Sequence, residues 1–236
     1  MATPTHPIVV ITGTNTDVGK TIVTAALAVA LHDAGLAVHV IKPAQTGEPE
    51  GSGDRFTAEH LSGGVITTDE CARYPEPLAP NLSATRAGMP QLTLGDVAAH
   101  IRSTVEQAPP HQITLVEGAG GLLVRIADDW TIADLAAELG APLLVVTSTG
   151  LGSLNLAELT VEAAARRGVN TLGLVGGSLP QEPDLATRLN LDEFPIVTGV
   201  PLLGCLPENS GTLPPEAFAA MVRQQALDVT PLLTLD

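Results

Sequence analysis

Residues 8–34 read IVVITGTNTDVGKTIVTAALAVALHDA, and this stretch decides the fold. Residues 8–12 are almost entirely apolar and β-branched, which is typical of a strand buried on both faces of a parallel sheet. A loop between Gly13 and Thr21 follows and leads into a helical pattern at residues 20–34. Such a turn points several backbone N–H groups at one spot, where the helix dipole favours a polyphosphate. The stretch therefore predicts a strand, a phosphate-binding loop and a helix.

The end of this loop carries the residue types that phosphoryl chemistry uses. Lys20 would reach the β- and γ-phosphates of a nucleotide, and the Thr21 hydroxyl would ligate Mg²⁺. Five residues separate Gly13 from Gly19, whereas the common phosphate-loop pattern has four. The Gly-Lys-Thr end and its context between a strand and a helix are intact, so we still predict nucleotide binding here.

Outward from this unit, apolar runs alternate with helical patterns along the whole chain. We predict strands at 8–12, 37–41, 113–117, 143–147, 171–175 and 201–206, and helices at 20–34, 95–107, 132–139, 154–167, 183–191 and 215–227. This alternation predicts one α/β domain over residues 1–236, with a doubly wound, mostly parallel sheet flanked by helices. Ligands of such sheets bind at the carboxyl ends of the strands.

Lysine usage singles out a second site residue. Nine of the 11 basic residues are arginine, and Lys20 and Lys42 are the only lysines in the sequence. Lys42 begins the segment KPAQTG after the predicted second strand, at the same end of the sheet as the first loop. A compact ammonium at that point would stabilise charge on a transferred phosphoryl group.

Two acidic residues are candidate metal ligands. Glu117 ends the predicted third strand and precedes Gly118-Ala119-Gly120-Gly121, where glycines allow close approach of a ligand. An acid at this place in nucleoside triphosphate enzymes helps to hold Mg²⁺. Asp54 follows Gly51-Ser52-Gly53 and is either a further oxygen ligand or simply the N-cap of a helix.

Composition limits the partners. With 26 acidic and 11 basic residues, the formal charge of −15 repels nucleic acid and anionic lipid, and the five aromatic residues are scattered singly. No apolar run reaches the roughly 18–20 residues of a membrane span. The first seven residues carry no basic region typical of a secretion signal. These features predict a soluble cytoplasmic protein that acts on small molecules, not on nucleic acid or membranes.

The cysteines and histidines give no metal or disulfide pattern. Cys71 and Cys205 are too few for a disulfide framework and are expected to be buried or incidental thiols. The six histidines form no pair with metal-ligand spacing, so surface or loop positions are expected for them.

Taken together, the motifs resemble those of the dethiobiotin synthetases, and the similarity covers most of the chain. Residues 13–21 are similar to that family's GTxTxVGKT loop, which has the same extra residue, and residues 42–47 match its KPxxTG segment. Further matches are the proline-rich residues 74–80, the EGAGG segment at 117–121 and the GxLN segment at 152–155.

The resemblance implies an ATP- and Mg²⁺-dependent cyclo-ligase that closes the ureido ring of dethiobiotin from 7,8-diaminononanoate and CO₂, through a phosphorylated carbamate. It implies catalytic roles for Lys20 and Lys42, and a homodimer with the substrate at its interface. It places Mg²⁺ on Thr21, Asp54 and Glu117. Nucleotide contacts are implied for Thr16, Asp17, Val18, Gly19, Lys20, Thr21, Ile22, Asp54, Glu117, Gly118, Gly120, Gly177, Pro207 and Glu208, and substrate contacts for Thr46, Gly120, Leu151, Leu154 and Asn155.

The match is weakest at the nucleobase. Family members often have an asparagine that reads adenine after the late strand, and this chain has Gly177 there. Because glycine has no side-chain amide to distinguish bases, the sequence leaves the base preference open between ATP and other nucleoside triphosphates. Backbone groups of Pro207 and Glu208 are expected to flank the base.

Two other classes share this type of loop. Switch ATPases of the MinD/ParA kind, which act through nucleotide-gated dimerisation, typically carry a lysine early in the loop, where this chain has Thr14 and Asn15. Amide synthetases of the cobyric-acid type need an attached glutaminase domain, for which 236 residues leave no room. Phosphate release that depends on the diamine and CO₂ would separate the synthetase from both.

Overall fold

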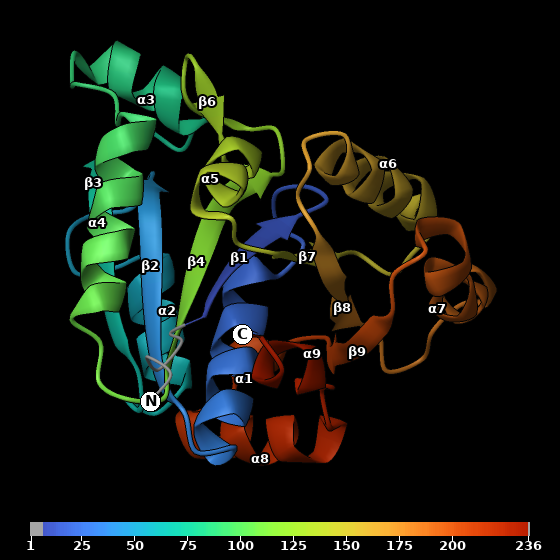
Figure 1. The fold of residues 1–236 in the computed structure, drawn as a ribbon. Coiled ribbons are helices and arrows are strands. Elements are labelled where there is room, and N and C mark those ends of the chain that lie inside the picture. The colour runs from blue at the N-terminus through green and yellow to red at the C-terminus, as the bar shows by residue number, and fades with distance from the viewer. Residues whose placement is uncertain (1–6, 236) are drawn as a thin grey trace.

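A computed structural model describes residues 7–235. Residues 1–6 and 236 lie outside the described part, so most of the N-terminal segment that was predicted to lack a secretion signal lies outside it too. Within the described part, seven parallel strands form one sheet in the order β3-β2-β4-β1-β7-β8-β9 (Figure 1). A short antiparallel hairpin, β5-β6, lies apart from this sheet. The predicted doubly wound α/β fold is confirmed.

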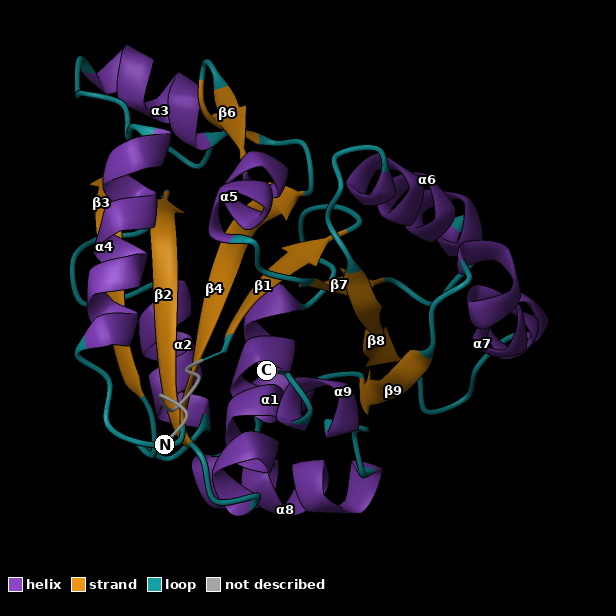
Figure 2. Cartoon of the chain, viewed as in Figure 1, coloured by secondary structure: helices purple, strands orange, loops and turns teal. Residues whose placement is uncertain are grey.

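Helices alternate with the strands along the chain (Figure 2). The strands are β1 (Ile8–Gly13), β2 (Ala37–Thr46), β3 (Thr67–Tyr74), β4 (Gln112–Gly121), β5 (Arg125–Ala127), β6 (Trp130–Thr131), β7 (Leu143–Thr147), β8 (Thr171–Leu179) and β9 (Leu202–Pro207). The helices are α1 (Lys20–Asp33), α2 (Asp54–Leu61), α3 (Pro80–Ala87), α4 (Leu94–Glu106), α5 (Ile132–Leu139), α6 (Ser153–Ala165), α7 (Leu185–Thr198), α8 (Pro215–Gln225) and α9 (Thr230–Leu233), with a 3₁₀ turn at Ser210–Thr212.

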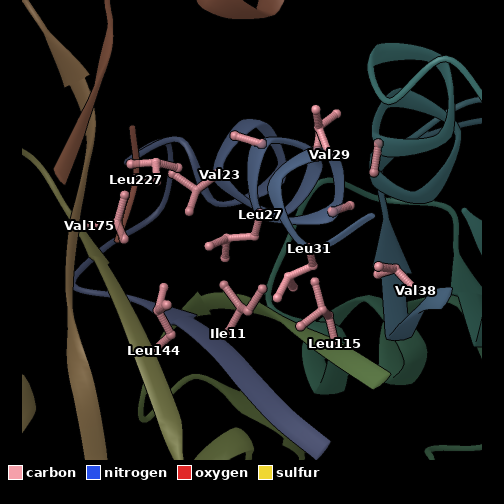
Figure 3. Close-up of a cluster of buried hydrophobic side chains, with 14 of the residues drawn as sticks. Ile11, Val23, Leu27, Val29, Leu31, Val38, Leu115, Leu144, Val175 and Leu227 are labelled. Carbon is pink, nitrogen blue, oxygen red and sulfur yellow. The ribbon is translucent and has the colours of Figure 1, made fainter. Parts of the chain in front are cut away.

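Alternate residues of the central strands pack in two hydrophobic layers, one on each face of the sheet. Val9 and Ile11 of β1 pack in the layer that α1, α2, α8 and α9 cover, and Val10 packs in the layer beneath α4 to α7. Figure 3 shows the first layer, where Leu27 and Leu31 of α1 lie over Ile11 and its neighbours. Because both faces are covered, these strands read as continuous apolar runs.

Several elements differ from their predicted bounds. The predicted strand at 37–41 continues to Thr46, because Lys42 to Thr46 pair with β3, so Lys42 lies within a strand and not in a loop after it. The predicted N-cap role of Asp54 is wrong: Gly53 is the N-cap and Asp54 is the first helical residue. The predicted helix at 183–191 runs on to Thr198, through Pro195.

The edge strand β3 was not predicted. Its sequence, TTDECARY, is polar and only partly buried, so it lacks the apolar run that marks the inner strands. Trp130 is buried just before α5, where its Nε1–H donates to the Leu92 carbonyl at 2.9 Å. Among the described residues, no helix is both long and apolar enough to cross a membrane.

Candidate active site

The loop between β1 and α1 has the backbone shape that a phosphate cradle requires. Asp17 and Gly19 both adopt the left-handed region, with φ of 58° and 92°. A Cβ on Gly13 would lie 2.7 Å from the Asn15 carbonyl oxygen, so the start of the loop also needs glycine. The Lys20 ammonium folds back and donates to that same carbonyl at 3.2 Å. The N-terminus of α1 therefore opens onto a tight loop with an adjacent cation.

Lys42 reaches the same place from β2. Its Nζ lies 2.5 Å from Asp54 Oδ2, 3.0 Å from Glu117 Oε1 and 2.9 Å from the Gly118 carbonyl oxygen. Thr21 Oγ1 donates to the same Glu117 oxygen at 2.8 Å. Residues from α1, β2, α2 and β4 thus meet at the carboxyl end of the sheet, where ligands of doubly wound folds bind.

Burial and mutual charge shape these groups. Burial lowers the pKa of Lys42, but the Glu117 and Asp54 carboxylates outweigh that effect and hold the pKa above its ordinary value. Lys20 differs, because burial and the nearby Lys42 charge together lower its pKa. Burial raises the pKa of Asp54, but Lys42 outweighs it and the pKa falls below its ordinary value. The resting site is a network of paired charges.

A cavity of about 760 Å³ opens over this network. Ten of the predicted site residues line it: Thr16, Asp17, Gly19, Lys20, Thr21, Ile22, Lys42, Thr46, Asp54 and Gly120. Apolar residues contribute to the lining as well, among them residues 77–80, Ala119 and Val124. The volume suits a small organic ligand beside a polyphosphate.

The donor set at the base of the cavity fits Mg²⁺. Thr21, Asp54 and Glu117 offer only oxygen, which Mg²⁺ prefers over nitrogen or sulfur. The three side chains are linked, since Thr21 donates to Glu117 and Lys42 contacts both carboxylates. Within residues 7–235, no cluster of three or more His, Cys, Asp or Glu side chains is arranged to hold a metal, so a site here depends on the Thr21 hydroxyl as well as the two acids.

The remaining residues that the sequence predicts to contact a nucleotide come from β4, β8 and the end of β9. Glu117 and Gly118 contact Lys42 beneath the cavity. A Cβ on Gly177 of β8 would lie 1.9 Å from the Val18 carbonyl oxygen, so this strand end touches the loop backbone. Pro207 and Glu208 precede the 3₁₀ turn that packs on Ile22, where a Cβ on Gly211 would meet Ile22 Cδ1 at 2.7 Å.

Three predicted substrate residues lie away from the cavity wall. Leu151 is 91% exposed in the loop before α6, and Leu154 and Asn155 lie in the first turn of that helix. The structure therefore does not bring them together with Lys20 and Lys42 within one chain.

Sequence reasoning missed Gln45, which lines the cavity and is buried. The strand predicted from the sequence ends at residue 41, which leaves Gln45 in a loop, where a polar residue needs no explanation. A polar side chain inside a buried strand is the signal that the correct strand bounds would have given.

Comparison with known proteins places the fold in the class of P-loop nucleotide-binding proteins. A family model described as an AAA domain matches residues 8–216. The cell division ATPase MinD of Pyrococcus furiosus aligns with a TM-score of 0.55 at 19% identity, over 93% of this chain and 98% of that one. A ParA family ATPase from Chlorobium tepidum aligns with a TM-score of 0.56 at 12% identity, over 99% and 94%. At such identities the likeness shows the fold alone.

The curated relatives are more specific. An ATP-dependent dethiobiotin synthetase of Corynebacterium diphtheriae is 59% identical over 91% of this chain and 95% of its own length. One from Rhodococcus erythropolis is 52% identical over 90% and 93%. The chain therefore belongs to the dethiobiotin synthetase family, and the likeness to MinD and ParA is confined to the fold.

Proposed function

We propose that the cavity between Lys20 and Lys42 carries out ATP-dependent dethiobiotin synthesis, the activity for which the relatives are named. The observation that carries this proposal is the convergence of the sequence's two lysines, from α1 and β2, on one cavity with three oxygen donors at its base. The substrates are 7,8-diaminononanoate, CO₂ and a nucleoside triphosphate.

Each charged side chain has a part in this chemistry. One amine of the diamine adds CO₂ to give a carbamate, the carbamate oxygen takes the γ-phosphoryl group, and the second amine displaces phosphate to close the ring. Lys20 holds the phosphates at the N-terminus of α1, and Lys42 neutralises charge on the carbamate and the transferred group. Thr46 and the Gly120 backbone face the diamine across the cavity. Positioning and charge neutralisation are what phosphoryl transfer requires.

We place Mg²⁺ on Thr21, Asp54 and Glu117, because their hard oxygen donors fit it. When bound, the ion supplies charge neutralisation at the phosphates. Lys42 contacts both acids, so its ammonium lies next to the same donors.

In this proposal only backbone groups contact the nucleobase of the nucleoside triphosphate. Gly177 has no room for a side chain against Val18, which supports a site without a side-chain amide for adenine. Pro207 and Glu208 then flank the base through their backbone. Turnover with ATP, GTP and CTP at equal concentrations tests this point, and strong selectivity for ATP would contradict it.

We also propose a homodimer, in the cytoplasm, in which Leu151, Leu154 and Asn155 of one subunit meet substrate held mainly by the other. None of the three lines the cavity of its own chain, which supports this arrangement. The helices α6 and α7, which lie side by side at one end of the sheet (Figure 1), carry several exposed apolar side chains that a partner would cover. They are Leu151, just before α6, with Leu159, Leu185, Leu189 and Ile196.

The decisive experiment is product formation. The purified protein is incubated with 7,8-diaminononanoate, bicarbonate and MgATP, and the ureido product and ADP are measured together. We expect one ADP for each ring closed. Nucleotide hydrolysis that does not respond to the diamine would instead point to a switch ATPase and contradict the proposal.

A further inference from the structure

The N-terminus of α2 lacks a capping side chain of its own. Its N-cap residue is Gly53, with φ of 105° and ψ of −169°, and its first helical residue is Asp54. Helix N-termini leave backbone N–H groups without partners, and Ser, Thr, Asp or Asn at the N-cap commonly accepts from them. The acceptor for α2 must therefore come from elsewhere.

Gln45 of β2 supplies it. Its side-chain Oε1 accepts a hydrogen bond from the Asp54 backbone N–H at 2.8 Å, and its Nε2–H donates to the Thr46 carbonyl at 3.3 Å. Gln45 is 4% exposed, so its side chain makes these two bonds from a buried position. A Cβ on Gly53 would lie 2.7 Å from the Gln45 amide, which explains why a capping residue with a side chain has no room there.

Asp54 is thus held from β2 at two points. Gln45 fixes its backbone, and Lys42, three residues earlier on the same strand, lies 2.5 Å from its carboxylate. The carboxylate would keep its place beside Thr21 and Glu117 through this double contact.

We propose that Gln45 is a positioning residue that fixes Asp54 in the metal-binding set. This inference rests on the proposed placement of Mg²⁺ on Thr21, Asp54 and Glu117. It goes further by assigning an effect on metal affinity to a residue that is not itself one of the three proposed metal ligands. Mutating a residue that hydrogen-bonds to a metal ligand typically weakens metal affinity by 10- to 100-fold.

Mn²⁺ binding in the presence of ADP tests the proposal, measured as free Mn²⁺ by electron paramagnetic resonance. Mn²⁺ replaces Mg²⁺ because both prefer oxygen ligands. Gln45→Met keeps the length of the side chain and removes the acceptor, and we expect the Kd for Mn²⁺ to rise about tenfold. Gln45→Glu keeps an acceptor at the same place, and its Kd should stay at or below that of the parent. ADP binding in EDTA should be unchanged in Gln45→Met.

Two further variants make the result specific. Thr93 Oγ1 caps α4 by accepting from the Asp96 N–H at 3.1 Å, and Thr93 does not line the cavity. Thr93→Ala is therefore the matched control, because it also removes a helix cap but does so outside the cavity. It should lower the melting temperature without changing the Kd for Mn²⁺. Asp54→Asn should weaken Mn²⁺ binding at least as much as Gln45→Met.

The failures are distinguishable. Unchanged Mn²⁺ binding in Gln45→Met, or equal weakening in Gln45→Met and Gln45→Glu, would overturn the role of Gln45 while the metal site stands. Unchanged binding in Asp54→Asn would show that the metal is placed elsewhere, and the role of Gln45 would fall with the site.

Discussion

The Lys42 ammonium lies among Asp54, Glu117 and the Gly118 carbonyl, so it stabilises the ligand-free protein as well as serving the proposed reaction. Removing one partner of a buried ion pair leaves charge without compensation, at a cost of about 3–5 kcal/mol. We expect Lys42→Met to lower the melting temperature clearly in EDTA, and added MgCl₂ to restore part of the loss. Lys20→Met is the control, because the Lys20 bond goes to a backbone carbonyl. A Mg²⁺ response equal in both variants would contradict this.

Turnover gives a separate test of the same residue. In Lys42→Gln, kcat for ring closure should fall by roughly 10²–10³, which corresponds to about 3–4 kcal/mol for one preorganised donor to the transition state. Steady-state assays with the diamine varied at saturating MgATP measure it. Unchanged turnover would remove Lys42 from the mechanism.

Cys71 should be an unreactive thiol. Burial, with the nearby charges of Asp69 and Glu70, raises its pKa from 9.0 to about 12, so the thiolate that reacts is about 10³-fold rarer near neutral pH. Burial also raises the pKa of Cys205. We expect iodoacetamide at about pH 8 to label the urea-unfolded chain far faster than the folded one, by peptide mass spectrometry. Equal rates for Cys71 in both states would be inconsistent with this environment.

At the scale of elements, Asp69 of β3 connects the edge strand to its neighbours. It accepts from His39 Nε2 of β2 and from His100 Nε2 of α4, each at 3.2 Å, and His39 also contacts Thr67. His100 is exposed on a helix, which agrees with the expected surface position, whereas His39 is partly buried in a strand, where sequence reasoning expected a surface or loop position. It supplies polar contacts for a strand that lacks an apolar run.

The pKa of Asp69 gives this network a pH dependence. Burial raises that pKa, but the two histidine hydrogen bonds outweigh it and bring it below 3.8. The charged carboxylate therefore stabilises the fold at pH values above 3.8, and the contribution disappears as the pH falls through the lower folded value. Asp69→Asn should reduce the free energy of unfolding by about 1 kcal/mol at about pH 7, with a smaller difference in acid. Urea unfolding measures it, with the exposed Asp192→Asn as control. Equal losses in the two variants would contradict the role.

Periodicity located the inner strands and the phosphate loop because their signals are local. The run at Val9 to Ile11 and the glycines around Lys20 each determine their own conformation. β2 extends to Thr46 because its last residues pair with β3, as Lys42 does with Glu70. No local sequence pattern predicts that pairing, because the two strands are separated in the sequence. The contact between Gly177 and Val18 likewise joins segments far apart in the sequence. Long-range pairing is thus the part that the single sequence could not supply.

At the scale of the whole molecule, one sheet carries both hydrophobic layers, which supports the proposed single domain. The cavity lies at the carboxyl ends of β1, β2 and β4, while the exposed apolar side chains gather around α6 and α7, beyond β7. The second subunit in the proposed dimer would bring a different part of the surface to the substrate. The cavity of one chain and the α6 segment of its partner would then form one site.

The dimer is testable through the exposed leucines. Sedimentation should give about twice the 24.2 kDa of one chain, and Leu159→Glu on α6 should shift the protein toward the monomer, because it places a charge in an apolar interface. Leu233→Glu on α9, a comparably exposed leucine outside those helices, is the matched control. In the Leu159 variant the KM for the diamine should rise more than the KM for ATP, because only the diamine is expected to contact both subunits. A monomeric parent, or a monomeric variant with unchanged KM for the diamine, would place the whole substrate site within one chain.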